Sequence, residues 1–310
     1  MLEILSSFTV LIEFFLFVVV GFVCRKLKAF DEGTIKGGTD LLLKVGVPGA
    51  IFASAESVVF DAQTIRNILF MFFLYAVWFG CMIPMMHLAS RTPLIAKEDR
   101  KAFVGTTVFK NISFMGIPLC AAVLGGESVF YVAICMTVYN FLHWSYGIYL
   151  YSGGHGLSLK TMASNIPMLS VFVMLLIKAC HIPLPQILWD TFSAAGSICT
   201  PVSLVIVGVM LAGVDLKVLF VDKALYLASG CTLVAAPLIA WIVVQVFGAT
   251  GEIAAVLILL SLTPSASMNA VLAKRYGKNG EYVSLMLLQT LLLSLATIPL
   301  LAATVFRSFF

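Results

Sequence analysis

The sequence predicts an all-α polytopic membrane protein with ten transmembrane helices, and three observations carry this prediction. Of its 310 residues, 61% are hydrophobic and only 11% are charged, whereas soluble domains average about 45–50% apolar and about 25% charged residues. Apolar runs close to the roughly 20 residues that a bilayer-spanning helix needs recur along the whole chain. The basic residues gather in every second connection between these runs. This composition excludes a soluble enzyme, a disulfide scaffold and a disordered protein, because no water-soluble fold buries so much apolar surface.

Ten apolar runs, each bounded by glycine, proline or charged residues, give the predicted spans. None of them alternates between polar and apolar residues as a membrane β-strand does. The first run lacks the basic leader region and small-residue cleavage site of a signal peptide, so we interpret it as a retained span. The runs lie at 5–23, 38–58, 67–88, 102–124, 129–151, 166–182, 188–212, 224–247, 253–273 and 282–305.

The distribution of basic residues predicts the orientation of these spans. Of the 19 lysines and arginines, 14 lie in the connections after the first, third, fifth, seventh and ninth spans, and three lie on the opposite side. Short loops rich in lysine and arginine stay in the cytoplasm. We therefore expect a multi-pass protein of the cytoplasmic (inner) membrane with both termini on the extracytoplasmic side. The positive charge reflects this topology, so the lipid bilayer is the expected partner and nucleic acid is not.

Ten spans divide into two sets of five, and an odd number of spans per set inserts the two sets in opposite orientations. Two pairs of matching residues support such a duplication. Pro201 follows Pro48 by 153 residues, and Gly277 follows Gly125 by 152 residues. The sequence thus predicts an inverted 5+5 repeat, with residues 1–155 as the first five-helix repeat and residues 156–310 as the second.

Two spans, at 102–124 and 253–273, carry proline and a polar cluster near the middle of the bilayer. Proline removes a backbone donor and clashes with the preceding turn, and the freed backbone groups are tolerated only within protein or beside water. Two interrupted helices at matching positions of two halves indicate a midplane substrate site. The alternative is a pair of ordinary proline kinks satisfied by serine and threonine side chains. The candidate substrate-binding residues in these spans are Lys110, Asn111, Ser113, Pro118, Pro264, Ser265, Ser267 and Asn269.

The breaks and their lysine favour a negatively charged ligand. The open N-terminus of a helix offers amide groups with partial positive charge, which suit an anion. Lys110 adds a full charge, which costs about 2.5–3.5 kcal/mol at the bilayer centre on insertion scales. It either attracts an anionic substrate or pairs with an internal acid, for which Glu13 is the candidate. Asn140 is a further candidate to line the site, while for His143 a buried core histidine is the favoured interpretation.

Motifs that carry enzymatic chemistry are absent from the sequence. It contains no H-E-x-x-H, no G-x-S-x-G, no phosphate-binding loop and no dinucleotide-binding fingerprint. The sequence therefore predicts a protein that is not an enzyme, with no catalytic residue, cofactor or metal site.

Residues 109–119 read F-K-N-I-S-F-M-G-I-P-L and resemble the F-G-N-T-G-F-M-G-I-P-L signature of the auxin efflux carrier family of bacterial and plant permeases. Four further stretches also resemble sequence patterns of this family, at residues 47–52, 201–213, 264–277 and 294–299. The long cytoplasmic loop of the plant carriers is missing, so the chain resembles a short bacterial member. It departs from the signature at three positions, where Lys110, Ile112 and Ser113 replace glycine, threonine and glycine.

This resemblance implies ten helices in an inverted repeat, with the fourth and ninth broken at prolines and crossing each other. It implies a scaffold part formed by helices 1, 2, 6 and 7, through which members often form homodimers. Helices 3–5 and 8–10 would form a mobile transport part that works by an elevator-like motion. The implied substrates are small organic anions, namely malate, malonate and other carboxylates or auxin-like acids, and the implied substrate contact is Asn111.

Two other functions remain open at this point. One is a cation-coupled symporter of the bile-acid sodium symporter type, which sodium-dependent uptake would reveal. The other is a membrane sensor that keeps a carrier fold without transporting, which would bind a ligand without moving it.

Overall fold

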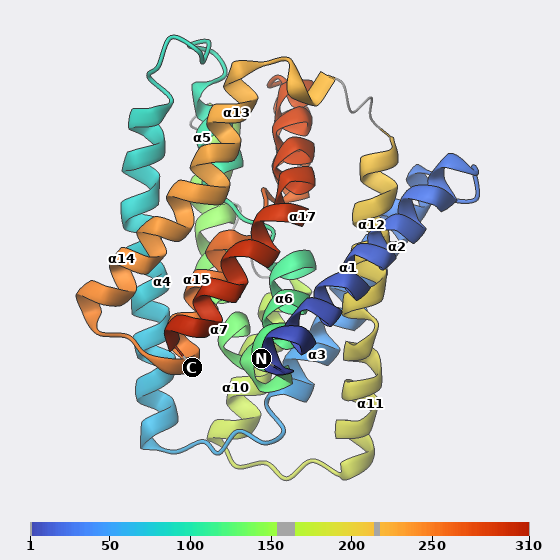
Figure 1. Cartoon of the computed structure of the whole chain (residues 1–310). Coiled ribbons are helices and arrows are strands. Elements are labelled where there is room, and N and C mark those ends of the chain that lie inside the picture. The colour runs from blue at the N-terminus through green and yellow to red at the C-terminus, as the bar shows by residue number, and fades with distance from the viewer. Residues whose placement is uncertain (1, 154–164, 214–217, 310) are drawn as a thin grey trace. The chain divides into compact units, whose positions relative to one another are not determined.

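The computed structural model describes residues 2–153, 165–213 and 218–309 of the chain, and in these ranges the structure is helical (Figure 1). Each of the ten apolar runs falls on one helix or on a short series of helical segments. Several of these series contain a five-residue π-helical turn. In chain order, the elements are α1 Leu2–Lys26, α2 Glu32–Leu41, π-turn η1 Leu42–Gly46, α3 Val47–Ser54, α4 Ala62–Ala89, α5 Arg100–Val108, π-turn η2 Ile112–Gly116, α6 Ile117–Leu124, 3-10 turn η3 Gly126–Ser128, α7 Val129–Leu142, π-turn η4 His143–Gly147, α8 Ile148–Ser152, α10 Ile166–Ala179, α11 Gln186–Ser197, α12 Cys199–Ala212, 3-10 turn η5 Val218–Phe220, α13 Lys223–Gly230, π-turn η6 Cys231–Ala235, α14 Ala236–Phe247, α15 Gly251–Leu262, α16 Ser267–Arg275 and α17 Gly280–Phe309.

The described helices include four that are long and apolar enough to cross a membrane. Three shorter apolar helices, at Ile112–Leu124, Ile166–Ala179 and Gly251–Leu262, accompany them. The prediction of an all-helical polytopic membrane protein is therefore confirmed. That all ten stretches cross the bilayer, and that the two halves form an inverted repeat, remain predictions. The four long helices are Ala62–Ala89, Gln186–Ala212, Lys223–Phe247 and Gly280–Leu301.

Three of the π-helical turns end two residues before a proline. Pro48, Pro118 and Pro237 each occupy the first turn of the α-helix that follows η1, η2 and η6. A proline ring has no N–H and clashes with the carbonyl of the preceding turn. A wider π-turn is one of the ways in which a helix accommodates such an interruption. The prolines therefore produce local widening in these helices rather than a complete break.

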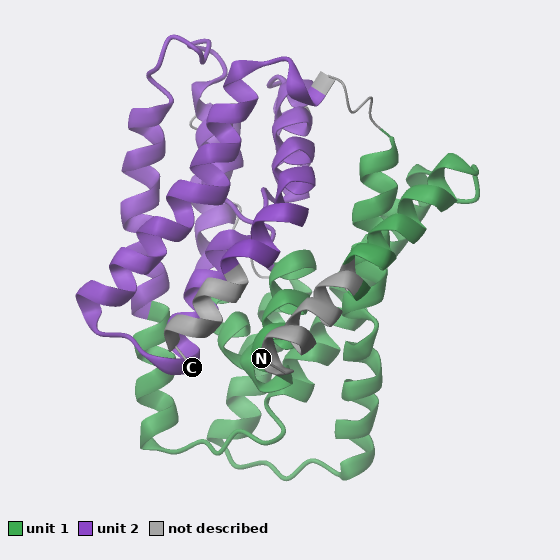
Figure 2. Ribbon diagram, viewed as in Figure 1, with its two compact units in different colours: residues 1–72, 113–137, 163–214 green, residues 73–112, 138–162, 215–310 purple. Residues whose placement is uncertain are grey.

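The chain forms two compact units that are interleaved along the sequence (Figure 2). Unit 1 contains residues 1–72, 113–137 and 163–214, and unit 2 contains residues 73–112, 138–162 and 215–310. The boundary at residue 155 and the division into scaffold and transport helices stay predictions.

Unit 1 is built on a very close approach of α1 and α12. A Cβ atom on Gly21 would lie 2.0 Å from the carbonyl oxygen of Val205, and one on Gly208 would lie 2.0 Å from that of Val18. Only glycine lets two helical backbones touch in this way, as at many interfaces between membrane helices.

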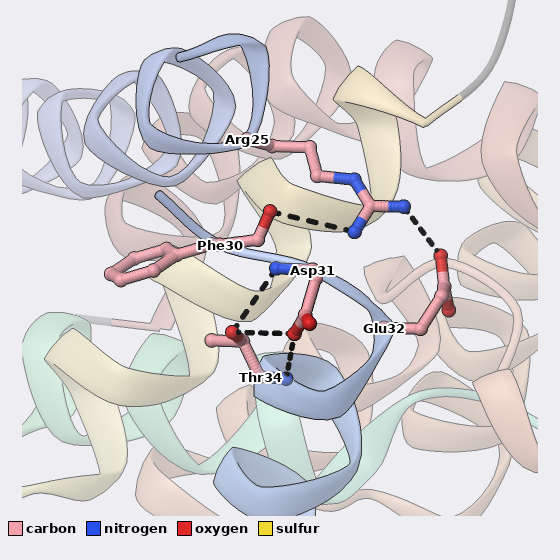
Figure 3. A network of polar contacts seen from close by, with 5 residues as sticks. All are labelled: Arg25, Phe30, Asp31, Glu32 and Thr34. Carbon is pink, nitrogen blue, oxygen red and sulfur yellow. Dashed lines mark hydrogen bonds and ion pairs between the residues drawn. The ribbon is translucent and has the colours of Figure 1, made fainter. Parts of the chain in front are cut away.

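The turn from α1 to α2 in unit 1 is held by the polar contacts of Arg25 and by those between Asp31 and Thr34 (Figure 3). Arg25 donates to the Glu32 carboxylate at 2.8 Å and to the Phe30 carbonyl at 3.5 Å. Asp31 caps α2, because its carboxylate accepts from the Thr34 amide at 2.9 Å while the Thr34 hydroxyl accepts from the Asp31 amide at 3.1 Å. This reciprocal arrangement satisfies amides that the first helical turn leaves free.

Candidate functional site

Unit 2 contains the two helix breaks that the sequence predicts, and both are genuine interruptions. α5 ends at Val108 and is followed by Phe109 in an extended conformation, with φ −87° and ψ 107°. α15 ends at Leu262 and is followed by Thr263, also extended, with φ −65° and ψ 149°. The ordinary-kink alternative is therefore wrong for these two spans.

The position of the first break differs from the one that the family resemblance implies. That break lies at residues 109–111, whereas Pro118 lies seven residues later in the first turn of α6. Pro118 follows the π-turn η2 within the continuous helical series Ile112–Leu124, which accommodates its missing amide by local widening. Pro264 does lie in its break, between α15 and α16.

The two breaks pair as a short antiparallel segment, which we call the crossover (residues 109–111 and 263–266). The amide of Asn111 donates to the carbonyl of Pro264 at 2.8 Å, and the amide of Ala266 donates to the carbonyl of Phe109 at 3.0 Å. Lys110 and Ser265 face each other between these two bonds. The pairing gives buried backbone groups hydrogen-bond partners where the two helices are interrupted.

Asn269 on α16 ties the crossover together through its side chain. Its amide nitrogen donates to the carbonyl of Phe109 and to the hydroxyl of Ser265, both at 3.1 Å. Its amide oxygen lies 3.3 Å from Nε2 of His143 in η4. All these groups are buried. Asn269 therefore has partners for both polar atoms within the fold, and its contacts are those of a residue that shapes the crossover.

Lys110 is buried in the crossover, with only 1% of its surface exposed. Its ammonium donates to the carbonyl oxygen of Thr232 in η6. In the π-helical register of η6, the amide of Ala236 bonds the carbonyl of Cys231, five residues earlier. The next residue, Pro237, has no amide proton for the carbonyl of Thr232. The lysine thus supplies the donor that the proline lacks.

The described residues provide no carboxylate for the Lys110 ammonium. Two ion pairs occur in them: Arg25 with Glu32, and Lys44 with Asp40 at 3.1 Å. The candidate partner Glu13 lies on α1 in unit 1 and is exposed. A buried ammonium that is bonded only to a carbonyl keeps two further N–H groups for other acceptors.

The remaining candidates are distributed over both units. Asn140 on α7 is buried, and Ser267 is half-buried at the first residue of α16; both belong to unit 2. Ser113 is half-buried in η2 and Pro118 is buried in α6, and both belong to unit 1. The candidates that make direct contacts with one another across the crossover are Lys110, Asn111, Pro264, Ser265 and Asn269.

Two participants in the site, Thr232 and Thr290, were missed from the sequence. Thr232 bonds Lys110 through its backbone carbonyl, which no side-chain pattern reveals. The one available signal was its position five residues before Pro237, which lacks an amide proton for that carbonyl. Thr290 on α17 accepts from the Ser265 amide at 3.3 Å. His143 is a buried core histidine, as favoured; its Nε2 contacts Asn269, and its ring packs against that of Phe109.

A family model described as "Membrane transport protein" matches the chain at residues 6–166 and 156–302. The chain belongs to the membrane transport protein family. This is the family of the auxin efflux carriers, so the resemblance seen in residues 109–119 is confirmed. Members of the membrane transport protein family are transporters rather than enzymes, and this transporter is a multi-pass protein of the lipid bilayer. No curated protein matches the sequence.

Proposed function

We propose that this transporter is a secondary carrier that moves a small organic anion across the cytoplasmic membrane by elevator-like alternating access. The proposed substrates are carboxylates such as malate or malonate, or an auxin-like acid. The observation that supports this proposal most directly is the burial of Lys110 in the crossover, with no carboxylate partner among the described residues.

An anionic substrate is the counter-charge that best fits this lysine. Burying an unpaired ammonium costs several kcal/mol, on the order of the desolvation of one ion, so the position requires compensation. The Thr232 carbonyl compensates one N–H and leaves the others for a ligand. Charge-assisted hydrogen bonds to a carboxylate are roughly twice as strong as neutral ones. A bound carboxylate would therefore offset the desolvation cost of the buried Lys110 ammonium.

The other candidate residues take complementary roles in this proposal. Asn111 and Ser113 follow Lys110 along the chain and offer polar side chains to the substrate. The half-buried hydroxyl of Ser267 stands at the open N-terminus of α16, where helix amides favour negative charge. Asn140 makes no side-chain hydrogen bond within the described part of the chain and keeps its amide for a ligand.

The test is uptake of radiolabelled malonate and malate by purified protein in liposomes. We expect Lys110→Ala and Asn111→Ala to lower the rate by about tenfold or more, the equivalent of one charge-assisted or polar contact of about 1.5–3 kcal/mol. Lys44→Ala removes an exposed lysine with an exposed partner and serves as the matched control with unchanged uptake. Unchanged uptake in both site variants would overturn the site assignment.

The same assay separates the other two functions. Uptake that requires sodium would identify a cation-coupled symporter. Ligand binding that raises the melting temperature, with no uptake, would identify a sensor.

A further inference from the structure

We infer that His143 is a positioning residue that orients the Asn269 amide and thereby fixes the geometry of the crossover. Its consequence for transport rests on the proposed function, whereas the contact itself does not. Both side chains are buried, with exposures of 2% for His143 and 0% for Asn269.

The bonding pattern determines which atoms face each other. The Phe109 carbonyl only accepts hydrogen bonds, so the Asn269 atom at 3.1 Å from it is the amide nitrogen. The amide oxygen of Asn269 therefore faces Nε2 of His143 at 3.3 Å. Because that oxygen only accepts, Nε2 of His143 carries the proton. The histidine is thus assigned the Nε2–H form, with its donor pointed at Asn269.

The surroundings of the imidazole restrict its orientation. Its ring centroid lies 4.6 Å from that of Phe109 and 5.2 Å from that of Tyr139. Gly147, one turn later, leaves the ring its space, since a Cβ there would lie only 2.9 Å from Cδ2 of His143. The ring is therefore held between aromatic neighbours and backbone, with Nε2 directed at Asn269.

Loss of the His143 donor would weaken the hold of the Asn269 side chain on both segments of the crossover, because Asn269 bonds Phe109 in one segment and Ser265 in the other. The Asn269 oxygen would be left buried without a partner, and a buried unsatisfied group costs about 1–3 kcal/mol. The amide is then free to turn away from the Phe109 carbonyl, which lies directly before Lys110 and Asn111. The predicted effect is therefore on the placement of the substrate-binding residues.

The contact is tested without transport by nitrogen-15 NMR of histidine-labelled protein in lipid bilayers. The chain has four histidines, and comparison with His143→Gln assigns the His143 signals. We expect the Nε2–H form in the wild type and in Ser265→Ala, which leaves the Asn269 oxygen in place, and a shifted Nε2 signal in Asn269→Ala. A His143 protonated at Nδ1 alone, or an Nε2 signal that is unchanged in Asn269→Ala, would overturn the inference.

The transport arm uses His143→Phe, which keeps an aromatic ring but removes the donor. We expect the KM for labelled malonate to rise by about tenfold with the maximal rate little changed. His143→Gln, which restores an N–H donor, should recover most of the affinity, and His143→Phe should add little in an Asn269→Ala background. Additive effects of the two substitutions, or no recovery in His143→Gln, would contradict a positioning role. Absence of malonate and malate uptake in the wild type would instead count against the proposed function. The NMR result would then still decide whether His143 orients Asn269.

Discussion

The ammonium of Lys110 bonds the carbonyl oxygen of Thr232, and this carbonyl is the one that Pro237 leaves without a helical donor. The lysine of the crossover is therefore joined to the helix series α13–η6–α14 through a defect that a proline creates. The Lys110 side chain satisfies a backbone group and is also the proposed substrate contact, and the two roles can be separated by mutation.

The first prediction concerns the coupling of Lys110 and Pro237. Lys110→Met removes the charge and the donor but keeps the length of the side chain, which leaves the Thr232 carbonyl unsatisfied. Pro237→Ala restores an amide in the helix and gives that carbonyl a partner. We expect Pro237→Ala to stabilise the Lys110→Met protein more than the wild type, by about 1–3 kcal/mol, measured as free energies of unfolding in detergent.

Pro299 provides the control for this comparison. It also lies inside a helix of unit 2, in α17, but no contact joins it to Lys110 among those described. Pro299→Ala should change stability equally in both backgrounds. An equal effect of Pro237→Ala in both backgrounds would show that the Thr232 carbonyl does not depend on the lysine.

The second prediction concerns the space around His143. Gly147→Ala places a Cβ 2.9 Å from the His143 ring and 3.2 Å from that of Phe109, so we expect a destabilisation of about 1–3 kcal/mol from overpacking. Gly80→Ala, in α4 of the same unit, meets no atom within 4 Å and should stabilise by about 0.5–1 kcal/mol. The melting temperatures of the two variants should therefore move in opposite directions from that of the wild type.

The third prediction concerns the backbone contact between α1 and α12. Gly208→Ala would put a Cβ 2.0 Å from the Val18 carbonyl, and since backbone cannot move aside as a flexible side chain does, the helices must separate. We expect a loss of about 1–3 kcal/mol or more, with faster proteolysis of the α1–α2 connection. Gly37→Ala, in α2, meets no atom within 4 Å and is the control. A Gly208→Ala protein as stable as this control would refute the close approach.

The fourth prediction concerns pH and the start of α2. The Thr34 amide and hydroxyl, helped by the charge of Arg25, hold the pKa of the Asp31 carboxyl below its ordinary value. A carboxyl with a lowered pKa stabilises the folded helix start above its unfolded pKa of about 3.9, and the stabilisation is lost as the pH falls through the lowered value. Hydrogen-exchange protection of the Thr34 amide, corrected for its intrinsic rate, should therefore decrease in acid.

Asn in place of Asp31 separates the cap from the charge. Asn is an equally good helix cap but does not titrate, so Asp31→Asn should keep its Thr34 protection in acid. Loss of protection at the same pH in wild type and variant would show that the Asp31 carboxyl is not the group responsible.

The helical class, the apolar spans and the two interrupted helices were predictable, because composition and proline content act locally. The location of the first break was not predictable. The proline of this span, Pro118, lies in α6, whereas the chain leaves the helix at Phe109. Pro118 lies in the continuous helical series Ile112–Leu124, where the π-turn η2 accommodates it without a break. The extended conformation at residues 109–111 instead receives its hydrogen bonds from a segment about 150 residues away, and no local pattern encodes that pairing.

The sequence by itself determined that this protein is a membrane protein that resembles a family of carriers. It also determined that a lysine and several polar residues lie at the interruptions of two matching helices. The tertiary structure alone decided what these residues do for one another. In the folded chain, the Thr232 carbonyl bonds Lys110, and the Asn269 side chain links His143 to the crossover by hydrogen bonds. The reason is physical: inside a bilayer every freed backbone group needs a partner, and packing decides which distant side chain or strand is near enough to supply it.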